Sequence, residues 1–180
     1  MNRFPMMFAV CASMAAPALF AQAKQAPPPQ NEIAMLKGSY TAIKNNLMKA
    51  AERMPEENYG FKASPDIRTF GQLVGHVADA QKLFCSRVSG GPGPTEQAEK
   101  TKTAKADLVA VLKESFDQCD AVFNGLADDD LTKMITAPNG AQTSKTGTLW
   151  RFIIGHSNEE YGYLAVYMRI KGIVPPSTQP

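Results

Sequence analysis

Four stretches of this chain repeat apolar side chains at every third or fourth position, which is the spacing of one face of an α-helix. They span residues 31–54, 69–88, 103–126 and 146–172. The longest stripe lies in the first stretch and consists of Ile33, Leu36, Tyr40, Ile43, Leu47, Ala50 and Met54. Helices with a single apolar stripe bury it most simply by packing together as a four-helix bundle. No stretch alternates polar and apolar residues with a period of two, so the sequence predicts an all-α fold.

Local signals indicate where these helices begin and end. Thr69 and Gln72 have the spacing of a capping box, in which two side chains satisfy backbone donors at a helix start. The glycine- and proline-rich run 89–94 ends the second helix, and Gly172 is suited to end the fourth. Three aspartates at 128–130 open a long connection that we expect to continue to about residue 146.

The N-terminus has the composition of a secretory signal peptide. Arg3 supplies a positive charge, residues 4–20 are mostly apolar, and residues 21–23, Ala-Gln-Ala, fit a cleavage site. The apolar run is interrupted by a serine and a proline and is shorter than the roughly 20 residues that a membrane-spanning helix needs. We therefore expect residues 1–23 to be removed and the protein to be exported, either periplasmic or secreted, with no membrane contact after cleavage.

Cys11 leaves a second interpretation of this segment open, in which the cysteine receives a lipid. Residues 8–10 before it are bulkier than a lipid-attachment signal usually has, which favours cleavage. Residues 24–30, with three consecutive prolines, are then a flexible tether. The bundle domain is expected to span residues 31–176.

The exported chain is close to electrically neutral. Without Arg3, the 19 Lys and Arg residues of the whole sequence become 18, against 17 Asp and Glu residues. This balance gives no reason to expect a nucleic-acid partner. The sequence also lacks a glycine-rich phosphate loop, a nucleophile elbow and a Cys-x-x-Cys pair. We therefore expect no organic cofactor, and a small-molecule substrate remains open.

Two polar residues interrupt the apolar stripe that we predict for the fourth helix. The stripe consists of Leu149, Ile153, His156, Glu160, Tyr163 and Tyr167. An unpaired carboxylate in a bundle core is costly, so Glu160 should become protonated, find a cationic partner or bind a metal ion. His156 and Glu160 are four positions apart, so both side chains project from the same face of the helix and could bind one ion.

The second helix contains the only other histidine of the chain, His76. It follows the same spacing as Leu73, Ala80 and Leu83, which suggests a side chain directed toward the core. If the second and fourth helices are neighbours, two imidazoles and one carboxylate converge inside the bundle. Helix bundles often bind metals through side chains of facing helices.

Two groups of motifs give a resemblance to a known family. The first group consists of Met54-Pro55-Glu56-Glu57-Asn58-Tyr59-Gly60-Phe61, Arg68-Thr69-Phe70-Gly71-Gln72-Leu73 and His76-Val77-Ala78. The second consists of His156-Ser157-Asn158-Glu159-Glu160-Tyr161-Gly162, Tyr167-Met168-Arg169 and Gly172-Ile173-Val174-Pro175-Pro176. In order and extent, these motifs resemble those of the DinB/YfiT-like family of metal-dependent enzymes. The resemblance implies a four-helix bundle of that type and, as in many family members, a homodimer.

The resemblance also implies a metal site with one altered ligand. Family members place one histidine on the second helix and two, as His-x-x-x-His, on the last. His76 and His156 match the first two positions, and Glu160 stands where the third histidine would be. A set of two histidines and one carboxylate suits zinc, nickel, iron or manganese and leaves positions open for water or substrate. The substitution could equally mark a member that has lost its metal.

Three function classes follow from this sequence. The first is a metal-dependent hydrolase, in which the ion activates a bound water. The second is a non-catalytic binding or structural bundle, in which a pair of core histidines is joined to the buried glutamate by hydrogen bonds without metal. The third is a thiol-dependent transferase or isomerase, which the wider superfamily includes. Whether the protein is an enzyme is therefore left open.

Two further acids lie near the predicted ligands. Asp79 is three residues after His76 and could orient its imidazole or act as a base, although a solvated surface acid is the simpler interpretation. Glu159 is about 100° around the helix from Glu160, so we do not include it in the site.

Cys85 and Cys119 are the cysteines that remain after processing. An oxidising compartment would permit a disulfide between them. Both could instead be small buried residues on bundle faces, which is a common role for free cysteine. The sequence does not give the distance that decides between the two.

Overall fold

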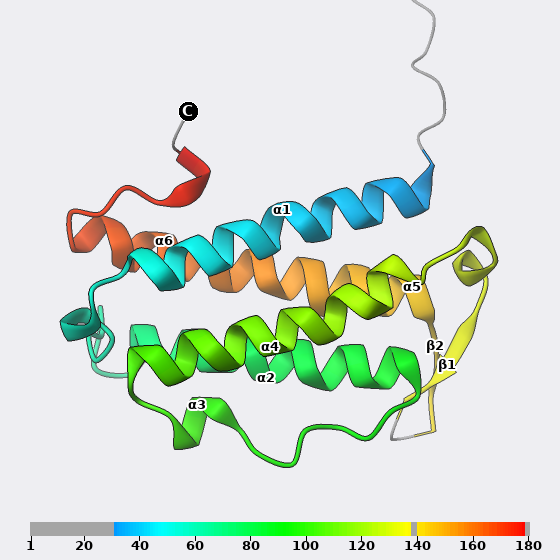
Figure 1. Cartoon of the computed structure of the whole chain (residues 1–180), viewed down its shortest axis with the longest axis horizontal. Helices are drawn as coiled ribbons and strands as arrows, with labels where there is room; N and C mark the ends of the chain where they lie inside the picture. Colours follow the sequence, from blue (N-terminus) through cyan, green and yellow to red (C-terminus); the bar gives the residue numbers. More distant parts are fainter. Residues whose placement is uncertain (1–30, 138–139, 179–180) are drawn as a thin grey trace, which may run out of the picture.

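A computed structural model of the chain describes residues 31–137 and 140–178. The predicted signal peptide, the predicted tether and Cys11 lie outside these residues. Four long helices run along the longest dimension of the molecule: α1 (Glu32–Arg53), α2 (Phe70–Ser89), α4 (Lys105–Asn124) and α6 (His156–Ile170) (Figure 1). The connections between them contain the short helices η1 (Glu56–Asn58), α3 (Ala98–Thr101), η2 (Asp128–Leu131), α5 (Lys145–Thr148) and η3 (Leu149–Gly155), and η4 (Pro176–Thr178) follows α6.

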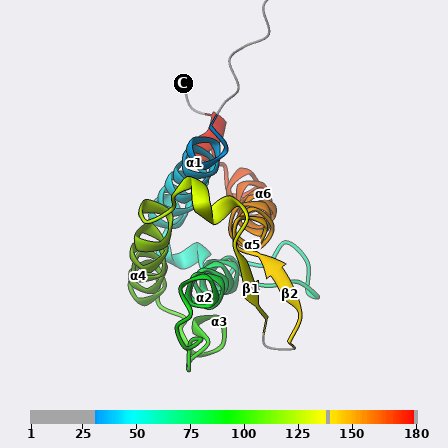
Figure 2. The same ribbon diagram turned by 90° about the vertical axis from the view of Figure 1, so that its right-hand side faces the viewer.

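Seen end-on, the four long helices are arranged around a common centre (Figure 2), and their buried side chains form one apolar core. Helix α2 packs against α4, and α1 packs against both α4 and α6. All seven residues of the predicted α1 stripe are buried, and Tyr40 stacks on Phe123 of α4 with ring centroids 3.8 Å apart. The predicted four-helix bundle is therefore confirmed. Within the described residues, no helix is long and apolar enough to cross a membrane.

The helix starts follow the local sequence signals. Asn31 accepts a hydrogen bond from the backbone N–H of Ala34, which caps α1. At α2, the Thr69 hydroxyl accepts from the Gln72 N–H, and the Gln72 side chain accepts from the Thr69 N–H. The predicted capping box is present, and it fixes the start of the helix that contains His76.

The fourth helix is not the single α-helix that we predicted over residues 146–172. It begins as α5, continues as the wider π-helix η3 and becomes α-helical again only at His156. Tyr163 does not face inward as predicted: it is 47% exposed, and the buried face of α6 continues through Leu164 and Tyr167. A simple three-and-four count does not resolve this, because Tyr163 and Leu164 lie three and four positions after Glu160.

The predicted stripe of α2 also needs correction. Ala80 and Leu83 are only half-buried, while the fully buried face passes through Val77, Gln81 and Cys85. His76 therefore lies at the border of the core face, where one side of its ring stays open to solvent.

The long connection between α4 and α5 contains a short hairpin that the sequence did not predict. Strands β1 (Met134–Thr136) and β2 (Gln142–Ser144) pair antiparallel, with Ile135 opposite Thr143. Three residues are too few for a period-two pattern to stand out in a sequence.

Asp130 fastens this connection to the start of α5. Its carboxylate accepts from Lys145 Nζ at 2.8 Å and from the Ala127 N–H at 3.0 Å, and Lys133 Nζ lies 3.3 Å away. These interactions, led by the Lys145 hydrogen bond, outweigh the effect of burial and lower the pKa of the Asp130 carboxyl. The contacts therefore stabilise the fold as long as Asp130 is ionised.

We expect Asp130→Asn to lower the free energy of unfolding at pH 7 by about 1.5–3 kcal/mol, since it weakens hydrogen bonds to a charged group. The folded pKa is depressed, so this contribution is complete above the ordinary Asp pKa of about 3.9 and is lost as the pH falls below it. The difference between the variant and the wild type should therefore shrink in acid. Urea unfolding at pH 7 and at several acidic pH values measures this, with exposed Asp129→Asn as the control. A difference that does not change with pH would contradict the assignment.

A disulfide joins Cys85 of α2 to Cys119 of α4. The two Cα atoms are 5.4 Å apart, which is within the range that a disulfide spans, and both residues are fully buried. Of the two alternatives that the sequence left open, the structure contains the covalent link.

Candidate metal centre

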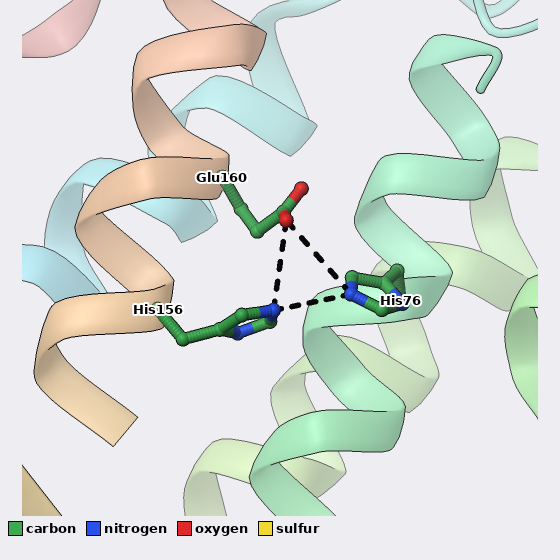
Figure 3. Close-up of side chains that lie close together, drawn as sticks. All are labelled: His76, His156 and Glu160. Atoms are coloured by element: carbon green, nitrogen blue, oxygen red, sulfur yellow. Dashed lines mark hydrogen bonds and ion pairs between the residues drawn. The ribbon is translucent and has the colours of Figure 1, made fainter. Parts of the chain in front are cut away.

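The three predicted ligands converge between α2 and α6 (Figure 3). His76 lies in the middle of α2, His156 is the first residue of α6, and Glu160 follows one turn later. His76 Nε2 is 3.1 Å from His156 Nε2, and Glu160 Oε1 is 3.8 Å from the first nitrogen and 3.5 Å from the second. One ligand atom from each residue therefore faces the same point.

The size of this triangle fits a single ion. A point at its centre lies about 2 Å from all three atoms, which is the usual length of a Zn–N or Zn–O bond. His156 Nδ1 is buried without a hydrogen-bond partner among the described residues, but it lies on the ring edge away from the triangle, so an ion bound by Nε2 would not contact it. The second carboxylate oxygen, Glu160 Oε2, is also buried without such a partner, and it belongs to the same carboxylate as the ligand atom Oε1. Buried polar atoms are rarely left without a partner, so the side chains present fit a divalent ion as the missing component.

Burial shifts the pKa values of both α6 residues of the cluster. It lowers the pKa of His156, and the neighbouring His76 lowers it further. It also raises the pKa of the Glu160 carboxyl, against the opposing charges of His76 and Arg68. A neutral imidazole is the form that binds a metal, and a bound cation would stabilise the ionised form of Glu160.

The second ring nitrogen of His76, Nδ1, contacts a residue that the sequence analysis did not predict as part of the site. Glu99 of α3 lies with Oε2 2.8 Å from His76 Nδ1, and its Oε1 accepts from Arg68 Nε at 2.6 Å. Burial alone would raise the pKa of Glu99, but the hydrogen bonds and charges of Arg68 and His76 outweigh it and lower that pKa. Glu99 lies in a polar, glycine- and proline-rich connection without helical periodicity, so no spacing pattern links it to His76.

Asp79, which we considered as the partner of His76, has a different role. Its carboxylate accepts from the backbone N–H groups of Ala98 and Glu99, at 2.8 and 3.0 Å. Glu159 accepts from the exposed Tyr163 hydroxyl and takes no part in the three-residue cluster. The sequence thus placed an acid near His76 in space, but the acid that contacts the ring is Glu99.

A solvent-accessible cleft of about 670 Å³ lies beside the cluster. Its wall includes Arg68 and Glu99, together with Leu73 from the turn of α2 before His76 and Tyr163 from the turn of α6 after Glu160. The side chains of His76 and His156 are 25% and 24% exposed, whereas that of Glu160 is only 6% exposed. The two imidazoles are therefore accessible to water, as an open site requires.

The model of the DinB superfamily matches residues 40–164, a segment that includes all three clustered residues. The chain belongs to the DinB superfamily. No curated protein matches its sequence.

Solved structures of DinB-like proteins share the fold. A DinB-like protein from Bacillus cereus superposes with a TM-score of 0.69 at 20% identity, over 82% of this chain and 97% of that one. YfiT from Bacillus subtilis, described as a probable metal-dependent hydrolase with an unusual four-helix bundle topology, gives 0.59 at 16% identity over 82% and 94%. A mycothiol-dependent maleylpyruvate isomerase gives 0.59 at 13% identity over 76% of this chain and 60% of that one. At these identities, the similarity establishes the DinB fold.

Proposed function

We propose that this DinB-superfamily protein binds one divalent metal ion through His76, His156 and Glu160 and uses it as a hydrolase of a small-molecule substrate. The observation that supports this most is the triangle of two Nε2 atoms and one carboxylate oxygen, with edges of 3.1–3.8 Å. The second oxygen of the same carboxylate, Glu160 Oε2, is buried without a protein partner among the described residues. The description of YfiT as a probable metal-dependent hydrolase agrees with it. Zinc, nickel, iron and manganese all suit this donor set.

The site combines a charged ligand with access to solvent. Glu160 supplies one negative charge, so a divalent ion there would keep a net positive charge toward its open positions. A zinc ion held there would act as a Lewis acid and could lower the pKa of a bound water to about 7. The imidazoles are about a quarter exposed and border solvent, and the neighbouring cleft is large enough to admit a small molecule.

The test is elemental analysis of residues 24–180, purified without an affinity tag and incubated separately with each of the four ions. We expect close to one ion per chain in the wild type and none in His156→Ala. Glu159→Gln is a matched control, since Glu159 is adjacent to Glu160 but lies outside the cluster. An empty wild type, or a variant that retains its ion, would contradict the proposed site, and a loaded wild type justifies a screen of ester, amide and phosphoester substrates.

The thiol-dependent interpretation is a second candidate because a mycothiol-dependent isomerase shares the fold. It predicts that activity depends on an added low-molecular-weight thiol, whereas a hydrolase needs only water. Assays with and without such a thiol therefore separate the two. A bundle without any activity is the third outcome.

We further propose that the protein is exported. The buried disulfide supports this, since disulfides form and persist mainly in oxidising compartments. Thiol labelling of the denatured, unreduced protein checks it: processing after Ala23 removes Cys11, so the exported protein should contain no free thiol. The homodimer stays a prediction.

A further inference from the structure

The short helix α3 is attached to α2 by the residues that flank His76. Gly75 precedes the histidine, and a Cβ atom at this position would lie 2.7 Å from the Glu99 nitrogen and 2.8 Å from its Cα. Only glycine therefore allows this approach, although glycine within a helix is unfavourable. Asp79, one turn after Gly75, accepts hydrogen bonds from the Ala98 and Glu99 N–H groups. Both contacts hold the backbone of Glu99 against the part of α2 that contains His76.

The side chain of Glu99 uses both of its oxygens. Oε1 accepts from Arg68 Nε, which fixes the carboxylate plane, and Oε2 lies 2.8 Å from His76 Nδ1. A carboxylate that is ionised only accepts, so Nδ1 of His76 must be the protonated nitrogen. The Nε2 lone pair of the neutral ring then points toward His156 and Glu160, at the corner of the triangle.

We propose that Glu99 is the positioning residue of the metal centre: it fixes the tautomer and the ring orientation of His76, and Arg68, Gly75 and Asp79 fix Glu99. This rests on the proposed metal site. Outer carboxylates of this kind orient imidazole ligands in many metal sites and increase their basicity. Helix α3 would then hold His76 at Nδ1, the ring nitrogen that does not face His156 and Glu160.

Two variants separate orientation from charge. Glu99→Gln keeps an oxygen that accepts from Nδ1–H but removes the charge, and Glu99→Ala removes both. Glu114→Gln is the matched control. Glu114 also forms an ion pair with α2, through Lys82, but it does not belong to the cluster of His76, His156 and Glu160. Circular dichroism and thermal unfolding check that each variant is folded.

The first measurement needs no metal. The ¹⁵N shifts of the imidazole nitrogens report the tautomer, and assignment is direct because the chain contains two histidines, one of which is removed in His156→Ala. We expect the Nδ1–H form of His76 in the wild type, Glu99→Gln and Glu114→Gln, and a mixture of tautomers in Glu99→Ala. An unchanged tautomer in Glu99→Ala would overturn the proposal.

The second measurement is a Co²⁺ titration followed by visible absorption. We expect the dissociation constant to rise about 10- to 100-fold in Glu99→Ala, with a smaller rise in Glu99→Gln and none in Glu114→Gln. A Glu99→Ala constant within two-fold of the wild type would also overturn the positioning role. If the wild type itself binds no Co²⁺, the proposed function fails, and the tautomer measurement alone decides whether Glu99 orients His76.

Discussion

Replacing Glu160 with leucine should abolish metal binding and at the same time make the metal-free protein more stable. The carboxylate is almost completely buried; Oε2 has no hydrogen-bond partner among the described residues, and Oε1 is 3.5 Å or more from either imidazole. A buried polar group without partners costs about 1–3 kcal/mol, and leucine has a similar volume without that cost. Metal binding by Glu160 would account for the presence of a carboxylate that destabilises the metal-free fold.

We expect the metal affinity of Glu160→Leu to fall by more than about 100-fold, because losing an outer hydrogen-bond partner alone costs about 10- to 100-fold. The metal-free variant should unfold at higher urea concentration than the metal-free wild type. Burial raises the folded pKa of Glu160, so ionisation destabilises the wild type as the pH rises above the ordinary Glu pKa of about 4.3. The advantage of leucine should therefore increase with pH.

Urea unfolding in a chelator, at pH 4, 6 and 8, measures both the sign and the trend. His156→Ala is the comparison that lacks metal but retains the carboxylate, and it should gain nothing. A Glu160→Leu variant that is less stable than the metal-free wild type at pH 8 would show that Glu160 is a structural hydrogen-bonded group, as the second function class requires.

Breaking the Cys85–Cys119 disulfide should cost about 4 kcal/mol of the free energy of unfolding. The bond closes a loop between residues 34 apart, and the loss of loop-closure entropy in the unfolded chain predicts this magnitude. For a domain of this size, the melting temperature should fall by roughly 8–16 °C. We expect this in Cys85→Ala/Cys119→Ala and in the wild type after reduction in denaturant and refolding with a reductant.

The single variants Cys85→Ala and Cys119→Ala serve as the control. Each one already breaks the bond, so each should lose nearly as much stability as the double variant, and the two losses should not add. Additive losses of about 1 kcal/mol each would mean that the cysteines act as separate buried side chains. Thermal unfolding with and without reductant, on all four proteins, distinguishes the two.

The parts of this fold that follow from periodicity could be predicted from the sequence. The α1 stripe is buried at every predicted position, and the capping box at Thr69 starts α2 where expected. His76, His156 and Glu160 could be found because polar residues in an apolar stripe need a partner, and the predicted convergence is present. The burial and capping signals each lie within one helix, and the convergence needed only the further assumption that α2 and α6 are neighbours.

Features that depend on contacts between distant segments could not be predicted in the same way. Glu99 lies 23 residues from His76, and its position depends on the fit of α3 against Gly75, which no spacing rule describes. The π-helix before His156 is invisible to a three-and-four count, because its residues are as apolar as those of an α-helix. The choice between free cysteines and a disulfide required the Cα–Cα distance.

The π-helix η3 sets the rotational phase of α6 relative to α5. Each residue of an α-helix advances the chain by about 100°, so the position of every side chain after η3 depends on how many residues its wide turns contain. Deleting a single residue between Leu149 and Gly155 would allow an ordinary α-helix there, but it would turn His156 and Glu160 away from His76. The convergence of His76, His156 and Glu160 therefore depends on the number of residues in this segment as well as on their identity.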